Sequence, residues 1–220
     1  MSESSLRYPQ LDRFYQRFLN EESSADFIQS VSTKYNLGSL ERLATGGGRL
    51  TRRAAILAIG FLGDFSNNEV VGRALNDEDR AVRMLADHGI RELWQRQGTA
   101  GQQQVLKRVF RLVDQSRMDE AVTAATQLIE SNSEFSEAYS QRAIAFCALG
   151  DYKSALVDCR DALHFNRFHF PAAIGLAHCC MQIDEASGAL AGYRLALNIN
   201  PDLDSVRRQV SRLERMLENN

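Results

Sequence analysis

Four cysteines and a histidine are the side chains of this sequence best suited to metal or thiol chemistry. His178, Cys179 and Cys180 are consecutive, and Cys147 and Cys159 precede them. Zinc sites prefer paired spacings such as Cys-x-x-Cys, which this group lacks, and neighbouring residues on a helix point about 100° apart. We therefore expect no metal site. The four cysteines are predicted to be reduced thiols, because disulfide frameworks are typical of short exported chains.

The histidines do not form a catalytic constellation with the other polar residues. His88, His164, His169 and His178 are scattered along the chain. Catalysis needs a nucleophile beside a base, or paired carboxylates in a pocket, and no recognisable spacing of either kind occurs. The sequence therefore predicts a protein that is not an enzyme and that needs no cofactor.

A triple glycine, Gly46 to Gly48, has the composition of a phosphate-binding loop. Such a loop needs a strand before it and a Lys-Ser/Thr pair after it, but Arg49-Leu50-Thr51 follows here. We predict a long and mobile turn between two helices instead.

Two groups of basic residues are the candidates for nucleic-acid binding, namely Arg49, Arg52 and Arg53, and Arg207, Arg208, Arg212 and Arg215. Glu41 reduces the positive charge of the first group, and Glu214 and Glu218 reduce that of the second. The chain has a formal net charge of −2, whereas binding to phosphates needs a cationic excess. Solvated helix faces are the preferred interpretation, so no nucleic-acid partner is predicted.

The hydropathy of the chain argues against a membrane protein. Its longest nearly continuous apolar run, Ala54 to Gly63, is about half as long as a membrane-spanning helix requires. The first residues, MSESSLRYPQ, lack the basic start and apolar core of a secretory signal. We therefore expect a cytoplasmic protein without a transmembrane segment.

The elements that carry these residues follow an internal repeat. Ala121, Ala155 and Ala189 are 34 residues apart, and two further sets share the spacing: Ile129, Leu163 and Leu197, and Leu112, Phe146 and Cys180. A fixed period of this length indicates an array of stacked helix pairs. Proline is scarce and good helix formers are abundant, so we predict an all-α solenoid of antiparallel helix pairs.

Each unit of the array is expected to contain two helices and a tight turn. Gly150 suits the left-handed position that ends the first helix of the middle unit. The stretch SEAYSQRAIAFCALGDYKSALVDCRDAL resembles a tetratricopeptide (TPR) repeat in its order of aromatic and small residues. The resemblance implies TPR units at 102–135, 136–169 and 170–203. The first unit departs from the pattern at Val109, where the family prefers a small residue. Apolar residues at helical spacing then predict a capping helix over 203–218.

The TPR resemblance also implies a site, because in that family the first helix of each pair lines a concave groove. The matching positions are Leu106, Phe110, Val113, Ser140, Ile144, Cys147, Ile174, His178 and Met181. These residues are mostly apolar, and Cys159 and Cys180 fall in the core phase. The groove is thus predicted to bind an apolar extended peptide or an amphipathic helix. The alternative is that the N-terminal half, the cap or a second copy of the chain fills it.

One ligand class of the family can be assessed directly. TPR domains that capture the C-terminal carboxylate of chaperones use lysine, asparagine and arginine residues as a clamp. The clamp positions here carry Leu106, Phe110, Gln141, Pro171 and Gly175. We therefore predict that an acidic C-terminal chaperone peptide does not bind.

A second repeat, with a period of 31, occupies the N-terminal half. It relates Thr51, Arg52, Ala55, Ala58, Ile59 and Leu62 to Val82, Arg83, Ala86, Gly89, Ile90 and Leu93. A short helix, an acidic turn and then Val-Arg-x-x-Ala resembles HEAT repeats, which implies that Asp77 or Asp79 pairs with Arg83. The predicted organisation is a helical hairpin with two HEAT-like repeats at 1–98, a linker at 99–104 and the TPR domain at 105–220.

The function that follows is a non-enzymatic scaffold for protein-protein interaction, whose partner the sequence does not identify. Two alternatives stay open. The first is a homo-oligomer whose groove is filled by another copy, and the second, more remote, is a lyase-like enzyme of the HEAT type.

Overall fold

The computed structural model of this chain describes residues 10–218. The segment at the extreme N-terminus, on which the expectation about a secretory signal rests, lies outside the described residues. The chain divides into two compact units, Met1–Leu93 and Trp94–Asn220. Between residues 10 and 218 it forms helices and turns without strands, so the predicted all-α class is confirmed.

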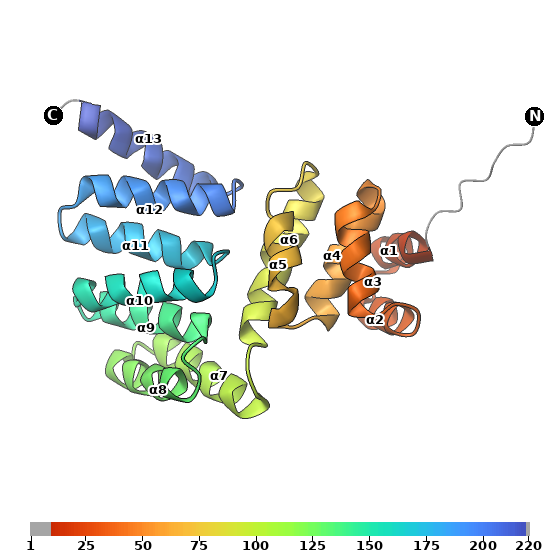
Figure 1. Cartoon of the computed structure of the whole chain (residues 1–220), viewed down its shortest axis with the longest axis horizontal. Coiled ribbons are helices and arrows are strands. Elements are labelled where there is room, and N and C mark those ends of the chain that lie inside the picture. Colours follow the sequence, from red (N-terminus) through yellow and green to blue (C-terminus); the bar gives the residue numbers. More distant parts are fainter. Residues whose placement is uncertain (1–9, 219–220) are drawn as a thin grey trace, which may run out of the picture. The chain divides into compact units, whose positions relative to one another are not determined.

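The C-terminal unit is a stack of helices in which successive helices lie side by side, coloured green to blue in Figure 1. Three antiparallel pairs are followed by a single helix at the position predicted for the cap. Their bounds are α7 Ala100–Asp114, α8 Met118–Ser131, α9 Ser136–Ala148, α10 Tyr152–Phe165, α11 Phe170–Gln182, α12 Ala186–Ile199 and α13 Asp204–Glu218. This is the solenoid of helix pairs that the 34-residue period predicts.

The turn inside each pair has the same backbone geometry three times. Ser116, Gly150 and Asp184 occupy equivalent positions and have positive φ angles of 58°, 82° and 59°. The amide after each of them donates to the carbonyl five residues earlier: Arg117 to Leu112, Asp151 to Phe146 and Glu185 to Cys180. This hydrogen bond is typical of the Schellman motif that ends a helix. The role predicted for Gly150 is thus confirmed, and serine and aspartate take the same role in the other two turns.

The turns between pairs repeat as well. Asn132, Asn166 and Asn200, again 34 residues apart, follow α8, α10 and α12. Each side-chain oxygen accepts a hydrogen bond from the amide two residues later, at 3.1–3.2 Å. Asparagine favours such a turn because its side chain satisfies the local backbone. The turn chemistry therefore spaces the pairs as regularly as the core does.

Small residues hold the helices of this unit close together. Ala121, Ala155 and Ala189, which define the period, are completely buried. A Cβ atom on Gly192 of α12 would lie 2.9 Å from the Cβ atom of Ala177 on α11, closer than real contacts allow. The close approach of α11 and α12 therefore requires glycine at this position.

The N-terminal unit contains the hairpin α1 Gln10–Glu21 and α2 Ser24–Ser32, followed by two further pairs. These are α3 Leu37–Gly46 with α4 Arg49–Leu62, and α5 Asn68–Ala74 with α6 Arg80–Gln95, separated by the 3-10 turn Phe65–Asn67. A Cβ atom on Gly60 or Gly89 would lie 3.1–3.2 Å from the Cα atom of the other glycine, so α4 and α6 approach closely there.

The acidic turn before α6 pairs differently from the prediction. Arg52 donates two hydrogen bonds to the Asp77 carboxylate, at 2.8 and 2.9 Å, and Arg53 donates two to Asp79, at 2.8 and 2.6 Å. Arg83, the predicted partner, donates to the main-chain carbonyl of Asp77 at 3.0 Å. The two carboxylates thus pair with arginines of α4, and Arg83 hydrogen-bonds to the backbone of the turn.

Two predicted connections are also corrected. The triple-glycine turn is short, because α3 ends at Gly46 and α4 begins at Arg49. A Cβ atom on Gly47 would lie 2.5 Å from the Leu43 carbonyl oxygen, so glycine serves packing there. Most of the predicted linker 99–104 is helical, because Thr99 caps α7 in a reciprocal capping box with Gln102.

Candidate functional site

The C-terminal unit contains a pocket of about 490 Å³ between α9, α10 and α11. Its lining is predominantly apolar or small and consists of Ser140, Ala143, Ile144, Cys147 and Ala148 from α9, Tyr152 and Cys159 from α10, and Pro171, Ala172, Gly175 and His178 from α11. A pocket of this size lies within the range of small-ligand sites and of pockets for large apolar side chains.

Small residues leave this space unfilled. Ala143 and Ala172 are buried on its walls, and a Cβ atom on Gly175 would lie 3.0 Å from the Cys159 sulfur. Larger side chains at these places would fill the pocket or displace α10. The alanines and the glycine that bring the helices together therefore also create the cavity.

Four of the nine predicted groove residues line this pocket. Ile144 is the most prominent, because 45% of its surface is exposed although it is a large apolar residue. Cys147 is half-buried and His178 is exposed, whereas Ser140 is buried at 4% exposure. The pocket thus joins residues from the first helices of the second and third pairs.

The other five predicted residues do not line the pocket, and one is placed in the core. Leu106 is completely buried and packs with Leu128, Phe135 and Ala138, so its predicted contact with a partner is corrected. The remaining four are Phe110, Val113 and Ile174, which are half-buried, and Met181, which is 37% exposed. The pocket is therefore shorter than the predicted groove from Leu106 to Met181.

Several pocket residues were missed as groove residues. Pro171 and Gly175 were noted only as clamp positions, although their place in the repeat already put them on the groove helices. Tyr152 and Cys159 belong to α10, the second helix of its pair, which the groove prediction leaves out. They line the pocket because it extends inward as far as α10, and the position of a residue in the repeat does not show how deep a pocket is.

A buried polar network joins the beginnings of α9 and α11. His169 Nδ1 accepts from the Ala172 amide at 3.1 Å, so the neutral ring carries its proton on Nε2 and donates it to Glu137 at 3.0 Å. Gln141 donates to the other Glu137 oxygen at 2.8 Å. The His169 ring also stacks on Trp94, with centroids 4.4 Å apart. Both ring nitrogens are occupied and the residue is inaccessible, so the network is structural.

All four cysteines are free thiols, and two of them, Cys147 and Cys159, line the pocket. Cys159 and Cys180 are buried at 2% and 3% exposure, which confirms that they face the core. Burial raises the pKa of Cys159 to about 12 and also raises the pKa of Cys179 and Cys180. These three side chains are therefore protonated at neutral pH and pack as small apolar groups.

Between residues 10 and 218, no group of three or more histidine, cysteine, aspartate or glutamate side chains is arranged to hold a metal ion. In the same part of the chain, no helix is both long enough and apolar enough to cross a bilayer.

No protein-family model matches the sequence, and no curated protein matches it. Solved structures do match. The first TPR domain of Spaghetti (RPAP3), bound to the HSP90 peptide SRMEEVD, aligns with a TM-score of 0.51 and 18% identity over 53% of this chain and 93% of that chain. At this identity the likeness shows the fold, which is TPR-like.

Two longer alignments have lower scores. The TPR2AB domain of yeast Sti1 in its pHSP90 complex gives a TM-score of 0.47 and 16% identity, over 93% of this chain and 95% of that chain. A thermophilic TPR protein from Thermus thermophilus gives 0.41 and 14%, over 93% and 97% of the two chains.

Proposed function

We propose that this protein is a non-enzymatic scaffold that binds an apolar side chain of a partner peptide or amphipathic helix in the pocket between α9, α10 and α11. The observation that carries the proposal is Ile144, a large apolar residue that is 45% exposed on the wall of a cavity of about 490 Å³. Covering its exposed half would contribute about 1 kcal/mol, roughly half the value for complete burial of such a side chain.

The charge of the pocket selects among ligands. Its lining contains no lysine or arginine, and Gln141, one of the clamp positions, is hydrogen-bonded to the Glu137 carboxylate. An acidic peptide would find no lysine or arginine to pair with in this lining. The proposed ligand is therefore apolar at its anchor and is not an acidic peptide such as SRMEEVD, to which the Spaghetti domain is bound.

The N-terminal unit has a supporting role in this proposal. Its α3–α4 and α5–α6 pairs, joined through arginine–aspartate contacts, are interpreted as HEAT-like repeats that stiffen the scaffold. The four free cysteines support the cytoplasm as its place of action, because thiols stay reduced there.

The test uses peptides selected on the full chain from a displayed random library, with binding measured by fluorescence anisotropy. Ile144→Asp places a charge on the pocket wall and is expected to raise Kd at least tenfold, or about 1.4 kcal/mol. Val157→Asp is the matched control, because Val157 is also exposed, at 54%, but lies on α10 outside the pocket lining. Its Kd should change less than about twofold.

Three outcomes would contradict the proposal. The first is equal loss of binding in both variants, and the second is no loss in Ile144→Asp. The third is saturable micromolar binding of the peptide SRMEEVD, which would overturn the choice of ligand charge. Light scattering of the free chain addresses the second-copy alternative, since a concentration-independent monomer would exclude a groove filled by another copy.

A further inference from the structure

Two of the four thiols approach each other between neighbouring helices of the groove. The sulfurs of Cys147 on α9 and Cys179 on α11 are 2.9 Å apart. A disulfide bond is about 2.05 Å long, so the two sulfurs need to move by less than about 1 Å to bond. The two residues are 32 positions apart in sequence, and stacking of successive pairs brings them together.

The two thiols differ in access. Cys147 is half-buried and lines the pocket, whereas Cys179 is completely buried behind it. A small molecule that enters the pocket therefore reaches Cys147 first, and Cys179 lies within reach of any product formed there. An accessible thiol beside a second, resolving thiol is the usual arrangement of an oxidation-sensitive pair.

We propose that Cys147 and Cys179 are a redox modification site at which a hydroperoxide, such as hydrogen peroxide, produces a reversible disulfide between α9 and α11. In the first step the Cys147 sulfur attacks the peroxide, the O–O bond breaks, and a sulfenic acid and one water form. In the second step the Cys179 sulfur attacks the Cys147 sulfur and the S–O bond breaks. Hydroxide leaves with the Cys179 proton as a second water. The two thiols together lose two electrons and two protons, which reduce the peroxide.

The other two cysteines have different surroundings, which makes them internal controls. The Cys159 sulfur faces Gly175, where a Cβ atom would lie 3.0 Å away, and the Cys180 sulfur faces Gly188, where a Cβ atom would lie 2.9 Å away. Cys180 thus points toward α12, although it follows Cys179 directly in the sequence. The geometry selects one thiol of the adjacent pair.

The bond would fasten the second helix pair to the third. A cross-link between positions 32 residues apart restricts the unfolded chain, so the oxidised protein should unfold at a higher temperature than the reduced protein. The inference stands on the two thiols alone and does not depend on the presence of a groove ligand.

The test treats the full chain with hydrogen peroxide, alkylates the remaining thiols and analyses non-reduced tryptic peptides by mass spectrometry. Cleavage separates Cys147 in peptide 143–153 from Cys159 in peptide 154–160, while Cys179 and Cys180 share peptide 168–194. The expected product is peptide 143–153 joined to 168–194 with loss of two hydrogens, and fragmentation should place the bond at Cys179. Dithiothreitol should remove it, and oxidation should raise Tm by about 5 °C.

Variants keep the test decisive. Cys147→Ser and Cys179→Ala should lose both the cross-linked peptide and the Tm increase, with helical circular dichroism confirming that they fold. Cys159→Ala and Cys180→Ala should retain both signals. If the wild-type protein after peroxide shows every thiol alkylated, a bond that includes peptide 154–160, or only bonds between two molecules, the proposal is wrong.

Discussion

Each of the two units contains an arginine–aspartate pair with two hydrogen bonds, but the pKa of the aspartate is shifted in opposite directions in the two pairs. In the N-terminal unit, hydrogen bonds from Arg53 hold the pKa of Asp79 well below its usual value. In the C-terminal unit, Asp158 receives hydrogen bonds from Arg142 at 2.8 Å, yet burial raises its pKa. The loss of hydration outweighs the attraction of the arginine at Asp158, whose side chain is 3% exposed, but not at Asp79, whose side chain is 7% exposed and also accepts a hydrogen bond from the Val82 amide.

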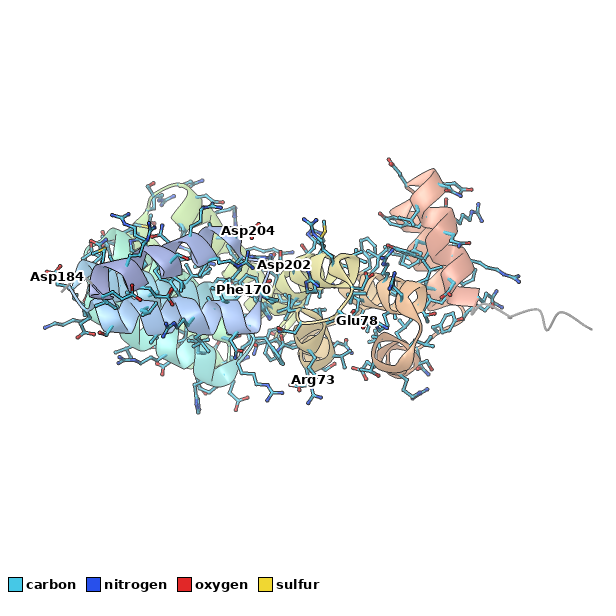
Figure 2. The ribbon with its side chains drawn as sticks, turned by 90° about the horizontal axis from the view of Figure 1, so that it is seen from above. Arg73, Glu78, Phe170, Asp184, Asp202 and Asp204 are labelled. Carbon is cyan, nitrogen blue, oxygen red and sulfur yellow. The ribbon has the colours of Figure 1, made fainter. Side chains whose placement is uncertain are left out.

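This difference shows how the units are stabilised and where binding is expected. The N-terminal unit pairs its basic cluster internally, since Arg52 and Arg53 both contact the turn before α6, where Glu78 is labelled in Figure 2. The C-terminal unit relies on contacts between small apolar residues, and these leave a pocket. Arginines that are already paired with aspartates of their own unit are poor candidates for phosphate binding. An open apolar pocket, in contrast, is a good candidate for peptide binding.

The largest effect is expected when the charged turn of the N-terminal unit is broken. Asp79→Ala removes the partner of Arg53 and the side chain that accepts from the Val82 amide at the start of α6. We expect the free energy of unfolding of this unit to fall by about 3 kcal/mol. Urea unfolding followed by circular dichroism measures the loss.

Glu78→Ala is the control for this change, because 79% of the Glu78 side chain is exposed although it contacts Arg52. Its effect should stay within about 0.5 kcal/mol. Trp94, the single tryptophan, lies at the end of α6 but belongs to the C-terminal unit, where it stacks on His169, so its fluorescence reports on that unit. If Asp79→Ala lowers the fluorescence midpoint as much as the circular dichroism midpoint, the two units do not differ in how they are stabilised.

A smaller effect is expected from the apolar packing of the C-terminal unit. Gly192→Ala adds a Cβ atom 2.9 Å from both the Cβ atom and the main-chain nitrogen of Ala177, and the helices must separate to accept it. We expect a loss of about 2 kcal/mol, visible in the Trp94 fluorescence transition. Gly101→Ala in α7 is the matched control, since its new Cβ atom would meet only the Thr99 hydroxyl at 3.9 Å. The control should be neutral or stabilising by up to about 1 kcal/mol, and equal losses in the two variants would refute the steric argument.

The smallest effect is expected just below the unfolded aspartate pKa, where a further fall in pH should change the stability of the two units in opposite directions. Because the folded pKa of Asp79 is lowered, its stabilising contribution is complete above the unfolded value of about 3.9 and is lost as the pH falls from there toward the folded pKa. The pKa of Asp158 is raised, so its protonation favours the folded C-terminal unit. The destabilising effect of its buried charge therefore decreases as the pH falls.

Acid titration with both probes measures this difference. Circular dichroism should report unfolding of the N-terminal unit at a pH at which Trp94 fluorescence is still native, and Asp79→Asn should weaken the dependence of the first transition on pH. Loss of the native Trp94 signal first would show that the two carboxyls do not set the order.

Much of the C-terminal fold was predictable from particular residues. The phase of Ala121, Ala155 and Ala189 placed Cys159 and Cys180 in the core, and it placed Ser140, Ile144, Cys147 and His178 on the helix faces that form the pocket. Leu106 shares the phase of Ser140, but Phe135 and Ala138 cover it. The period predicts which face of its helix a side chain occupies, but whether that face is exposed depends on the neighbouring helix that packs against it.

In the C-terminal unit the sequence by itself determined the helix pairs, the turns inside them and the buried stripe, because these depend on backbone hydrogen bonds and apolar spacing within about one repeat. Only the tertiary structure decided that Arg52 and Arg53 pair with Asp77 and Asp79, that a pocket opens beside Ile144, and that the sulfurs of Cys147 and Cys179 meet. The ion pairs and the sulfur contact join side chains 25 or more residues apart, and the pocket needs three helices, so these features depend on stacking, which local periodicity does not record.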